Sequence, residues 1–159
     1  MGETPRQELP GSNLLVHATT VALGTNAALL RGPSGSGKSD LALRFIFGEP
    51  MHANAQTEHR LVADDQTHLS LDTGRLFATA PVSITGLIEV RGVGIISVPT
   101  RPIAEVRLVI DLVSAHDVER LPDPDETVTM LGKAVPLRRL AAFEASAPLK
   151  LRLLLQALV

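Results

Sequence analysis

The chain has 159 residues, of which 45% are hydrophobic and 3% aromatic, and its formal net charge is −2. This length suits one domain, and the composition predicts an aliphatic core. Low charge and few aromatic rings argue against a nucleic-acid partner, which needs basic patches and stacking platforms. The absence of cysteine excludes disulfides, thiol catalysis and thiolate metal sites.

The amino-terminal residues 1–13 are polar and contain Pro5, Pro10 and Gly11. We expect a flexible leader there, followed by a single domain over residues 14–159. The leader lacks the hydrophobic segment of a secretory signal. No apolar run approaches the length of a membrane span, so we expect a cytoplasmic protein with no membrane partner.

Two strands are predicted at the start of this domain. Residues 16–23 are expected to form the first strand and residues 27–31 the second. The Gly-Thr-Asn sequence at residues 24–26 is typical of a tight turn. The two strands are therefore predicted to form a hairpin, and the second strand runs directly into the next motif.

A phosphate-binding motif follows, because the sequence fits the pattern G-x-x-x-x-G-K-[ST]. Its residues are Gly32, Pro33, Ser34, Gly35, Ser36, Gly37, Lys38 and Ser39. The glycines let several backbone N–H groups point at one anion. Lys38 adds a positive charge for the outer phosphates, and the Ser39 hydroxyl is small enough to enter the shell of a Mg²⁺ ion. A flexible Gly/Ser turn is the alternative, but the strand–loop–helix context favours phosphate binding.

A helix is predicted over residues 40–47, with apolar residues at i,i+4 spacing and Gly48 and Pro50 after its end. Its free N–H groups and dipole would face the phosphate. The polar connection that follows contains His52 and His59. Neither has a cysteine or carboxylate at ligand spacing, so we expect both to be solvated and not to bind metal.

Two adjacent acids, Asp64 and Asp65, end a short apolar strand that begins at residue 60. Ligands of open α/β sheets lie at the carboxyl ends of strands, so these acids are expected to face the phosphate-binding loop. Adjacent residues of a strand point in opposite directions, which predicts different roles. An Asp-Asp turn is the structural alternative. Asp111 ends another buried strand, over residues 106–112, and competes for the role of the acid that supports Mg²⁺; the pattern does not choose between the three.

Two further features are predicted. Residues 67–72 and 75–79 alternate around a Gly-containing turn and predict a hairpin with His68 exposed. Glu89 and Arg91 lie in an apolar, glycine-punctuated segment. They share a face if that segment is extended, and the flanking glycines favour a functional site over a solvated edge strand.

The carboxyl-terminal part is predicted to contain short strands over residues 127–130 and 133–135 and then a leucine-rich helix. Ser146 is the expected N-cap of this helix, which reaches Leu158. The helix is apolar nearly all round. Such a helix requires burial, either in its own core or against another subunit.

Several of these segments together resemble the catalytic domain of the HPr kinase/phosphorylase family. The matching segments, in the expected order over about residues 14–140, are Val16-His17-Ala18, Gly35-Ser36-Gly37-Lys38-Ser39-Asp40, Leu61-Val62-Ala63-Asp64-Asp65, Ile88-Glu89-Val90-Arg91-Gly92-Val93-Gly94-Ile95 and, more weakly, Glu119-Arg120-Leu121. The resemblance implies an α/β fold that contains a P-loop, with a PEP carboxykinase-like mixed β-sheet and flanking helices. It also implies that residues 14–159 are one catalytic domain.

The resemblance also implies a function. The family uses ATP and Mg²⁺ to phosphorylate a serine of HPr, the phosphocarrier of the sugar phosphotransferase system. It can reverse this reaction with inorganic phosphate. The chain would then be a serine/threonine-protein kinase that regulates carbohydrate metabolism. Family members are typically hexamers, so the resemblance implies a homo-oligomer.

Roles for the acids come with the resemblance. It makes Asp64 the acid–base residue, with His17 beside it to tune its charge. Asp65 would support the metal and nucleotide site, which decides against Asp111. The whole phosphate-binding loop would hold ATP.

The remaining roles concern metal and phosphate. By resemblance, Ser39 and Glu89 would hold Mg²⁺, and Lys38 would grip the outer phosphates. Arg91 and Arg120 would contact either the transferring phosphoryl group or the partner protein.

The sequence departs from the family in two ways. The large amino-terminal domain of most members is absent, as in short forms that resemble those of alphaproteobacteria. The usual Pro-Gly-Arg-Asn ending is not found after Val135-Pro136-Leu137. Metabolite regulation and the balance between kinase and phosphorylase therefore stay open.

Two other functions compete with this interpretation. One is a P-loop kinase for a small metabolite, which would normally need a lid with clustered arginines. The arginines here are scattered, at positions 101, 107, 138 and 139. The other is a non-catalytic nucleotide-binding switch.

Overall fold

The structure is a computed structural model that describes residues 13–48 and 54–158. The expected leader, residues 1–13, lies outside the described residues except for Asn13, which begins the first strand. His52 also lies outside the described residues. The strands are β1 (Asn13–His17), β2 (Thr19–Leu23), β3 (Asn26–Arg31), β4 (His59–Ala63), β5 (Gln66–Asp72), β6 (Arg75–Thr79), β7 (Leu87–Val90), β8 (Gly94–Ser97), β9 (Ile103–Leu112), β10 (Thr127–Met130) and β11 (Lys133–Leu140). The helices are α1 (Lys38–Phe47) and α2 (Ala147–Ala157), with short 3-10 turns at Val82–Ile84 and Ala115–Asp117.

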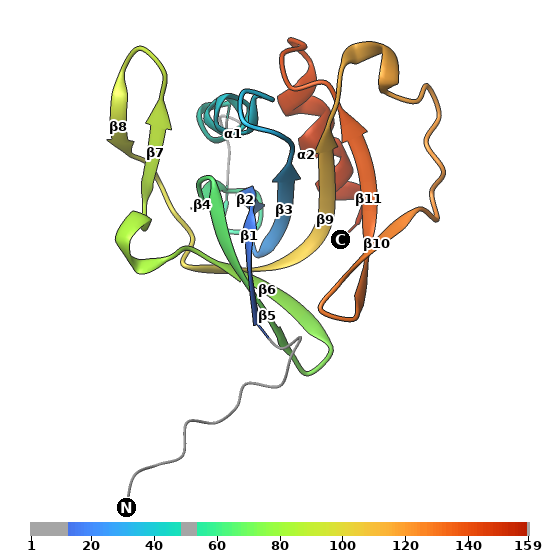
Figure 1. The fold of residues 1–159 in the computed structure, drawn as a ribbon, viewed down its shortest axis with the longest axis horizontal. Helices are drawn as coiled ribbons and strands as arrows, with labels where there is room; N and C mark the ends of the chain where they lie inside the picture. Colours follow the sequence, from blue (N-terminus) through green and yellow to red (C-terminus); the bar gives the residue numbers. More distant parts are fainter. Residues whose placement is uncertain (1–12, 49–53, 159) are drawn as a thin grey trace, which may run out of the picture.

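The main sheet is mixed and strongly curled (Figure 1). Its order is β1-β5-β6-β9-β3-β2-β4, and β11 joins beside β9 and carries β10. The β7–β8 hairpin forms a separate two-stranded sheet. This confirms the expected P-loop α/β fold with a mixed sheet and flanking helices.

Three strands of the sheet run parallel, because β9 pairs in parallel with β3 on one side and with β11 on the other. Leu30 of β3 lies beside Ile110 of β9, and Leu137 of β11 lies beside Val109. The carboxyl ends of these strands therefore share one edge, where ligands bind in α/β sheets. The predicted phosphate-binding loop leaves β3 at this edge.

The core has two parts, one on each face of the sheet. Leu30 and Ile110 face the helices, whereas their neighbours Leu29 and Val109 face the other way, as strand alternation requires. On the helix side the largest fully buried side chains include Leu41, Phe45, Leu151 and Leu155. Both helices thus cover the same face (Figure 1).

Most predicted elements are confirmed, with shifted ends. The strand expected over residues 16–23 is instead two strands, because the chain crosses at Ala18 from the edge of the sheet beside β5 to a place between β3 and β4. The hairpin β5–β6 and the exposure of His68 are confirmed. Ser146 holds the N-cap position of α2, although its side chain makes no capping hydrogen bond.

The expectation that His59 is solvated is wrong. The residue is 2% exposed, and its ring stacks on Phe45 with 4.2 Å between the ring centroids. Its Nδ1 lies 2.6 Å from the backbone carbonyl oxygen of Phe45. The ring of His59 thus packs the end of α1 against β4. The polar residues around His59 in the sequence did not indicate this burial.

Within the described residues, neither helix has the length and the apolar run that a bilayer crossing requires. The leucine-rich helix α2 is divided between two environments. Leu151 and Leu155 are fully buried, whereas Leu149 and Leu153 are 61% and 64% exposed. The helix is therefore buried, as expected, on the side of Leu151 and Leu155 and exposed on the side of Leu149 and Leu153.

These two environments predict different costs for the same substitution. Leu151→Ala should lower the free energy of unfolding by about 2–5 kcal/mol, because it leaves a cavity between α2 and the sheet. Leu153→Ala, the matched control on the exposed side, should change it by no more than about 0.5 kcal/mol. Urea denaturation followed by circular dichroism measures both values. Equal losses would contradict the packing described for α2.

Candidate active site

The loop between β3 and α1 has the geometry of an anion site. Gly35 and Gly37 have φ angles of 83° and 96°, which favour glycine, and Gly37 is the N-cap of α1. The first hydrogen bond of the helix runs from the N–H of Leu41 to the carbonyl oxygen of Gly37. The N–H groups of the residues before Leu41 are thus free of helical partners, and the positive end of the helix dipole lies here.

One side chain in the loop fits an oxyanion ligand directly. Lys38 lines the pocket of the loop and is only 6% exposed, and its Nζ donates to the carbonyl oxygens of Gly32 and Pro33 at 2.7 and 3.1 Å. This buried cation lies beside the free N–H groups at the start of α1, and both favour an anion. The residues present therefore fit a bound phosphate.

Asp64, at the end of β4, is the central acid of the site and is only 7% exposed. Its Oδ1 accepts hydrogen bonds from the hydroxyls of Ser39 at 2.7 Å and Thr19 at 3.1 Å. Its Oδ2 accepts the backbone N–H of Glu89 at 3.2 Å. One carboxylate thus fastens α1, β2 and the β7–β8 hairpin together.

Asp65 has a different environment, which a turn sets and not the alternation of a strand, because β4 ends at Ala63 and both acids follow it. Its φ of 63° is left-handed, and its side chain is 63% exposed. The Nε2 of His17 lies 2.7 Å from Oδ1 of Asp65. The resemblance had implied His17 beside Asp64; the left-handed turn at Asp65 instead brings this second carboxylate to the end of β1.

A pocket of about 440 Å³ brings most of the predicted residues together. It is lined by the loop, both acids, Glu89, Arg91 and Phe143. Arg91 lies in the turn of the β7–β8 hairpin, one residue after β7, and not on a strand face shared with Glu89 as expected. Within the described residues, no three His, Asp or Glu side chains gather closely enough to hold a metal ion alone.

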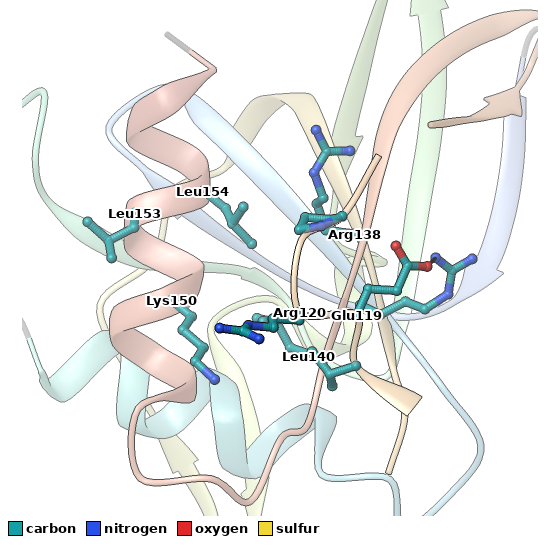
Figure 2. A pocket seen from close by; sticks show the side chains of 10 residues that line it. Glu119, Arg120, Arg138, Leu140, Lys150, Leu153 and Leu154 are labelled. Carbon is teal, nitrogen blue, oxygen red and sulfur yellow. Dashed lines mark hydrogen bonds and ion pairs between the residues drawn. The ribbon is translucent and has the colours of Figure 1, made fainter. Parts of the chain in front are cut away.

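Arg120 is not part of this pocket. It lines a second pocket of about 290 Å³, between the loop that follows β9 and helix α2 (Figure 2). Lys150, Leu153 and Leu154 of α2 form one wall of this pocket. Arg120 and Arg91 thus line different pockets, although the resemblance had implied the same choice of roles for both.

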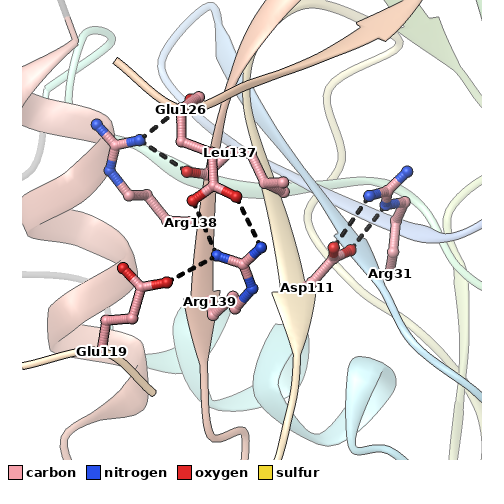
Figure 3. A network of polar contacts seen from close by, with 7 residues as sticks. All are labelled: Arg31, Asp111, Glu119, Glu126, Leu137, Arg138 and Arg139. Atoms are coloured by element: carbon pink, nitrogen blue, oxygen red, sulfur yellow. Dashed lines mark hydrogen bonds and ion pairs between the residues drawn. The ribbon is translucent and has the colours of Figure 1, made fainter. Parts of the chain in front are cut away.

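Asp111 serves another purpose. Its two carboxylate oxygens accept from Nε and an Nη of Arg31 at 2.8 and 3.0 Å (Figure 3). Of the three acids that the sequence left in competition, only Asp64 contacts Ser39. Arg31 immediately precedes the loop, so this bidentate pair fixes the end of β3 against β9.

A second group of ion pairs lies beside Asp111 in the sheet (Figure 3). Arg139 lies beside Asp111 in the register of β11 and β9 and binds Glu126 at 2.7 and 2.8 Å and Glu119 at 3.2 Å. The hydrogen bonds from Arg139 hold the pKa of the Glu126 carboxyl below its ordinary value and raise the pKa of Arg139 in turn.

Sequence reasoning missed two residues of the site. Thr19 supports both acids, because its hydroxyl donates to Asp64 and accepts the N–H of Asp65 at 3.1 Å. A threonine pair inside an otherwise apolar buried strand was the available signal. Phe143 lines the pocket although it lies more than a hundred residues after the loop, and no local pattern marks it.

A glycine-rich loop between a strand and a helix, with a strand-end aspartate bound to the loop serine, defines a P-loop protein of the α/β class. The family model "HPr Serine kinase C-terminal domain" matches residues 11–146. The chain therefore belongs to the HPr serine kinase C-terminal domain family, as the sequence resemblance had indicated.

Individual relatives agree with this assignment. HPr kinase/phosphorylase of Limosilactobacillus reuteri (strain DSM 20016) is 33% identical over 132 residues, which are 76% of this chain and 38% of the relative. That of Bordetella pertussis is 34% identical over 135 residues, 78% of this chain and 40% of the relative. The chain thus spans about two fifths of the length of these relatives. The solved Hpr(Ser) kinase/phosphatase from Coxiella burnetii matches with a TM-score of 0.75 and 28% identity, covering 91% of this chain and 89% of that chain.

The loop geometry predicts that Lys38→Ala weakens ATP binding strongly. The substitution removes the buried cation beside the uncapped end of α1, and a hydrogen bond to a charged group is worth about 1.5–3 kcal/mol, or roughly 10- to 150-fold in affinity. Isothermal titration calorimetry measures the affinity, with Lys133→Ala at the start of β11 as the control. Unchanged affinity in Lys38→Ala would remove the P-loop from the account.

Proposed function

We propose that the chain is the catalytic domain of an ATP-dependent protein kinase that phosphorylates a serine of HPr and can reverse the reaction with inorganic phosphate. The observation that carries the proposal is the pairing, in one pocket, of a P-loop with an exposed carboxylate, Asp65. The names of its relatives support HPr as the partner. We further propose that residues 14–159 form one catalytic unit, which works in the cytoplasm as a homo-oligomer.

The residues present fit a triphosphate and one Mg²⁺ ion. The loop amides and Lys38 would hold the phosphates. Ser39 and Glu89 would hold Mg²⁺, with Asp64 behind Ser39 to orient its hydroxyl. Mg²⁺ commonly takes one or two protein ligands together with substrate phosphates, so a cluster of acids is not required. When bound, the ion would neutralise charge on the phosphoryl oxygens.

We assign the acid–base role to Asp65, which revises the assignment made by resemblance. Both oxygens of Asp64 already accept hydrogen bonds, from two hydroxyls and one N–H, and the residue is buried. Asp65 is exposed in the same pocket, and its partner His17 can hold its orientation. An acceptor for the proton of a protein serine must be reachable by that serine, and Asp65 meets this requirement.

The proposed reaction needs little covalent work from the protein. The serine oxygen of HPr attacks the γ-phosphorus, the bond to the bridging oxygen of ADP breaks, and the serine proton passes to Asp65. In the reverse direction inorganic phosphate attacks the phosphorus of the phosphoserine, the bond from that phosphorus to the serine oxygen breaks, Asp65 gives its proton to this oxygen, and pyrophosphate leaves. Holding both reactants in line supplies about 7–11 kcal/mol of the barrier reduction. We place Arg91 at the transferring phosphoryl group and Arg120, which lines the other pocket, at the partner protein.

A transfer assay tests the function. The protein is incubated with Mg²⁺, ATP labelled in the γ-phosphate and purified HPr, and then phospho-HPr is offered with inorganic phosphate. Label on HPr is the expected result. Label on a small molecule would instead support a metabolite kinase, and binding of ATP without any transfer would support a nucleotide-dependent switch.

The acid assignment predicts a contrast between two substitutions. Asp65→Asn should lower transfer by about 10²–10⁴-fold while ATP affinity stays nearly unchanged, because it removes the proton acceptor alone. Asp64→Asn should weaken binding of Mg²⁺–ATP, because it disturbs Ser39. Asp72→Asn, at the end of β5, is the control. If Asp64→Asn alone abolished transfer with normal binding, the base would be Asp64.

His17 is expected to act through Asp65. His17→Ala should slow transfer by less than the full 10²–10⁴-fold that general-base catalysis contributes. Because the side chain is 53% exposed, the midpoint of thermal unfolding should not change. His68→Ala, an exposed histidine of β5, serves as the control. A lowered unfolding midpoint with a normal rate in the remaining folded protein would make His17 a purely structural residue.

A further inference from the structure

Phe143 is an exposed aromatic ring in the P-loop pocket. The chain has four phenylalanines and neither tryptophan nor tyrosine. Phe45 is buried, whereas Phe143 is 70% exposed and lines the pocket beside Lys38 and Ser39. No other aromatic side chain lines that pocket within the described residues. A large apolar side chain left exposed inside a polar pocket points to a ligand that covers it.

The ring packs directly on the start of α1. A Cβ atom at Gly37 would lie 2.7 Å from Cβ of Ala142 and 3.0 Å from Cζ of Phe143. Only a glycine at the N-cap therefore allows this approach, in addition to its left-handed φ of 96°. The edge of the ring thus adjoins the free N–H groups that would hold the phosphates.

The backbone that carries the ring is tied down on both sides. Arg44 of α1 donates to the carbonyl oxygen of Ala142 and, at 3.1 Å, to that of Glu144. The carboxylate of Glu144 accepts from Nζ of Lys150 of α2 at 2.7 Å. Residues 142–144 are thus fastened to both helices, so the ring is positioned before a ligand binds. Preorganisation of this kind lowers the cost of binding.

We propose that the ring of Phe143 stacks on the base of the bound nucleoside triphosphate. This inference rests on the proposed function, since it requires a triphosphate in the loop. The acid Asp64 is bonded to Ser39, and the ring packs on Gly37. A triphosphate across the helix start then has its transfer end at the acids and its nucleoside at the ring. Stacking on a phenyl face tolerates every base, so Phe143 supplies affinity with little selection between purines.

The test compares ligands with and without a base. Isothermal titration calorimetry with Mg²⁺ measures the affinity of ATP, GTP and inorganic tripolyphosphate for the wild type and for Phe143→Ala, Phe143→Leu and Phe143→Tyr. Stacking is worth about 5- to 150-fold in affinity per base. Phe143→Ala and Phe143→Leu should weaken ATP and GTP by that factor and leave tripolyphosphate unchanged. Phe143→Tyr, which keeps the ring, should bind as the wild type does.

Phe47→Ala is the matched control, because Phe47 is 65% exposed at the other end of α1 and does not line the pocket. Circular dichroism verifies that each variant is folded. Three results would overturn the inference: wild-type protein that binds tripolyphosphate as tightly as ATP, equal weakening of ATP and tripolyphosphate by Phe143→Ala, or ATP affinity that is the same in Phe143→Ala and Phe47→Ala. In the last case the exposed ring would belong to a protein interface.

The outcome is separable from that of the proposed function. Ring-dependent ATP binding without transfer to HPr contradicts the kinase and leaves the stacking intact. Transfer to HPr with ATP affinity that does not depend on the ring contradicts the stacking alone.

Discussion

The hydrogen bonds of the Asp64 carboxylate connect the parts of this protein that must act together. Asp64 is nearly buried, and it accepts from Ser39 at the start of α1, from Thr19 in β2 and from the backbone of Glu89 in the β7–β8 hairpin. A buried carboxylate is stable only when its oxygens have such partners. The hydrogen bonds that Asp64 requires therefore hold the P-loop serine and the β7–β8 hairpin, with Glu89 and Arg91, close to the same carboxylate.

The parallel strands β3, β9 and β11 form the edge of the sheet from which the P-loop extends. The ion pair of Arg31 and Asp111 links the ends of β3 and β9 in addition to their backbone hydrogen bonds. Arg139 of β11 lies beside Asp111 in register and binds Glu126, which precedes β10. The acid that the sequence left as a rival metal ligand thus acts as a structural tie behind the loop. The pocket with Arg120 is lined by α2 and the loop after β9, and it shares no lining residue with the P-loop pocket.

Much of the fold and part of the site could be predicted from the sequence, for identifiable reasons. The P-loop, the helix after it and the acids at the end of β4 were local patterns, and each is found as expected. The break at Ala18, the burial of His59 and the positions of Arg120 and Phe143 depend on packing between distant segments, which no local pattern records. The partner of His17 depends on the left-handed backbone at Asp65. An Asp-Asp pair indicates a turn but not which carboxylate faces solvent.

The central claim is that this edge holds a triphosphate with its γ-phosphate between the P-loop and Asp65. A crystal structure with Mg²⁺ and a non-hydrolysable ATP analogue tests it most directly. The account predicts the γ-phosphate at Nζ of Lys38, the metal at Ser39 and Glu89, and the Asp65 carboxylate facing the phosphorus on the side opposite the bridging oxygen. An analogue bound elsewhere, or an Asp65 carboxylate turned away from the γ-phosphate, would contradict it.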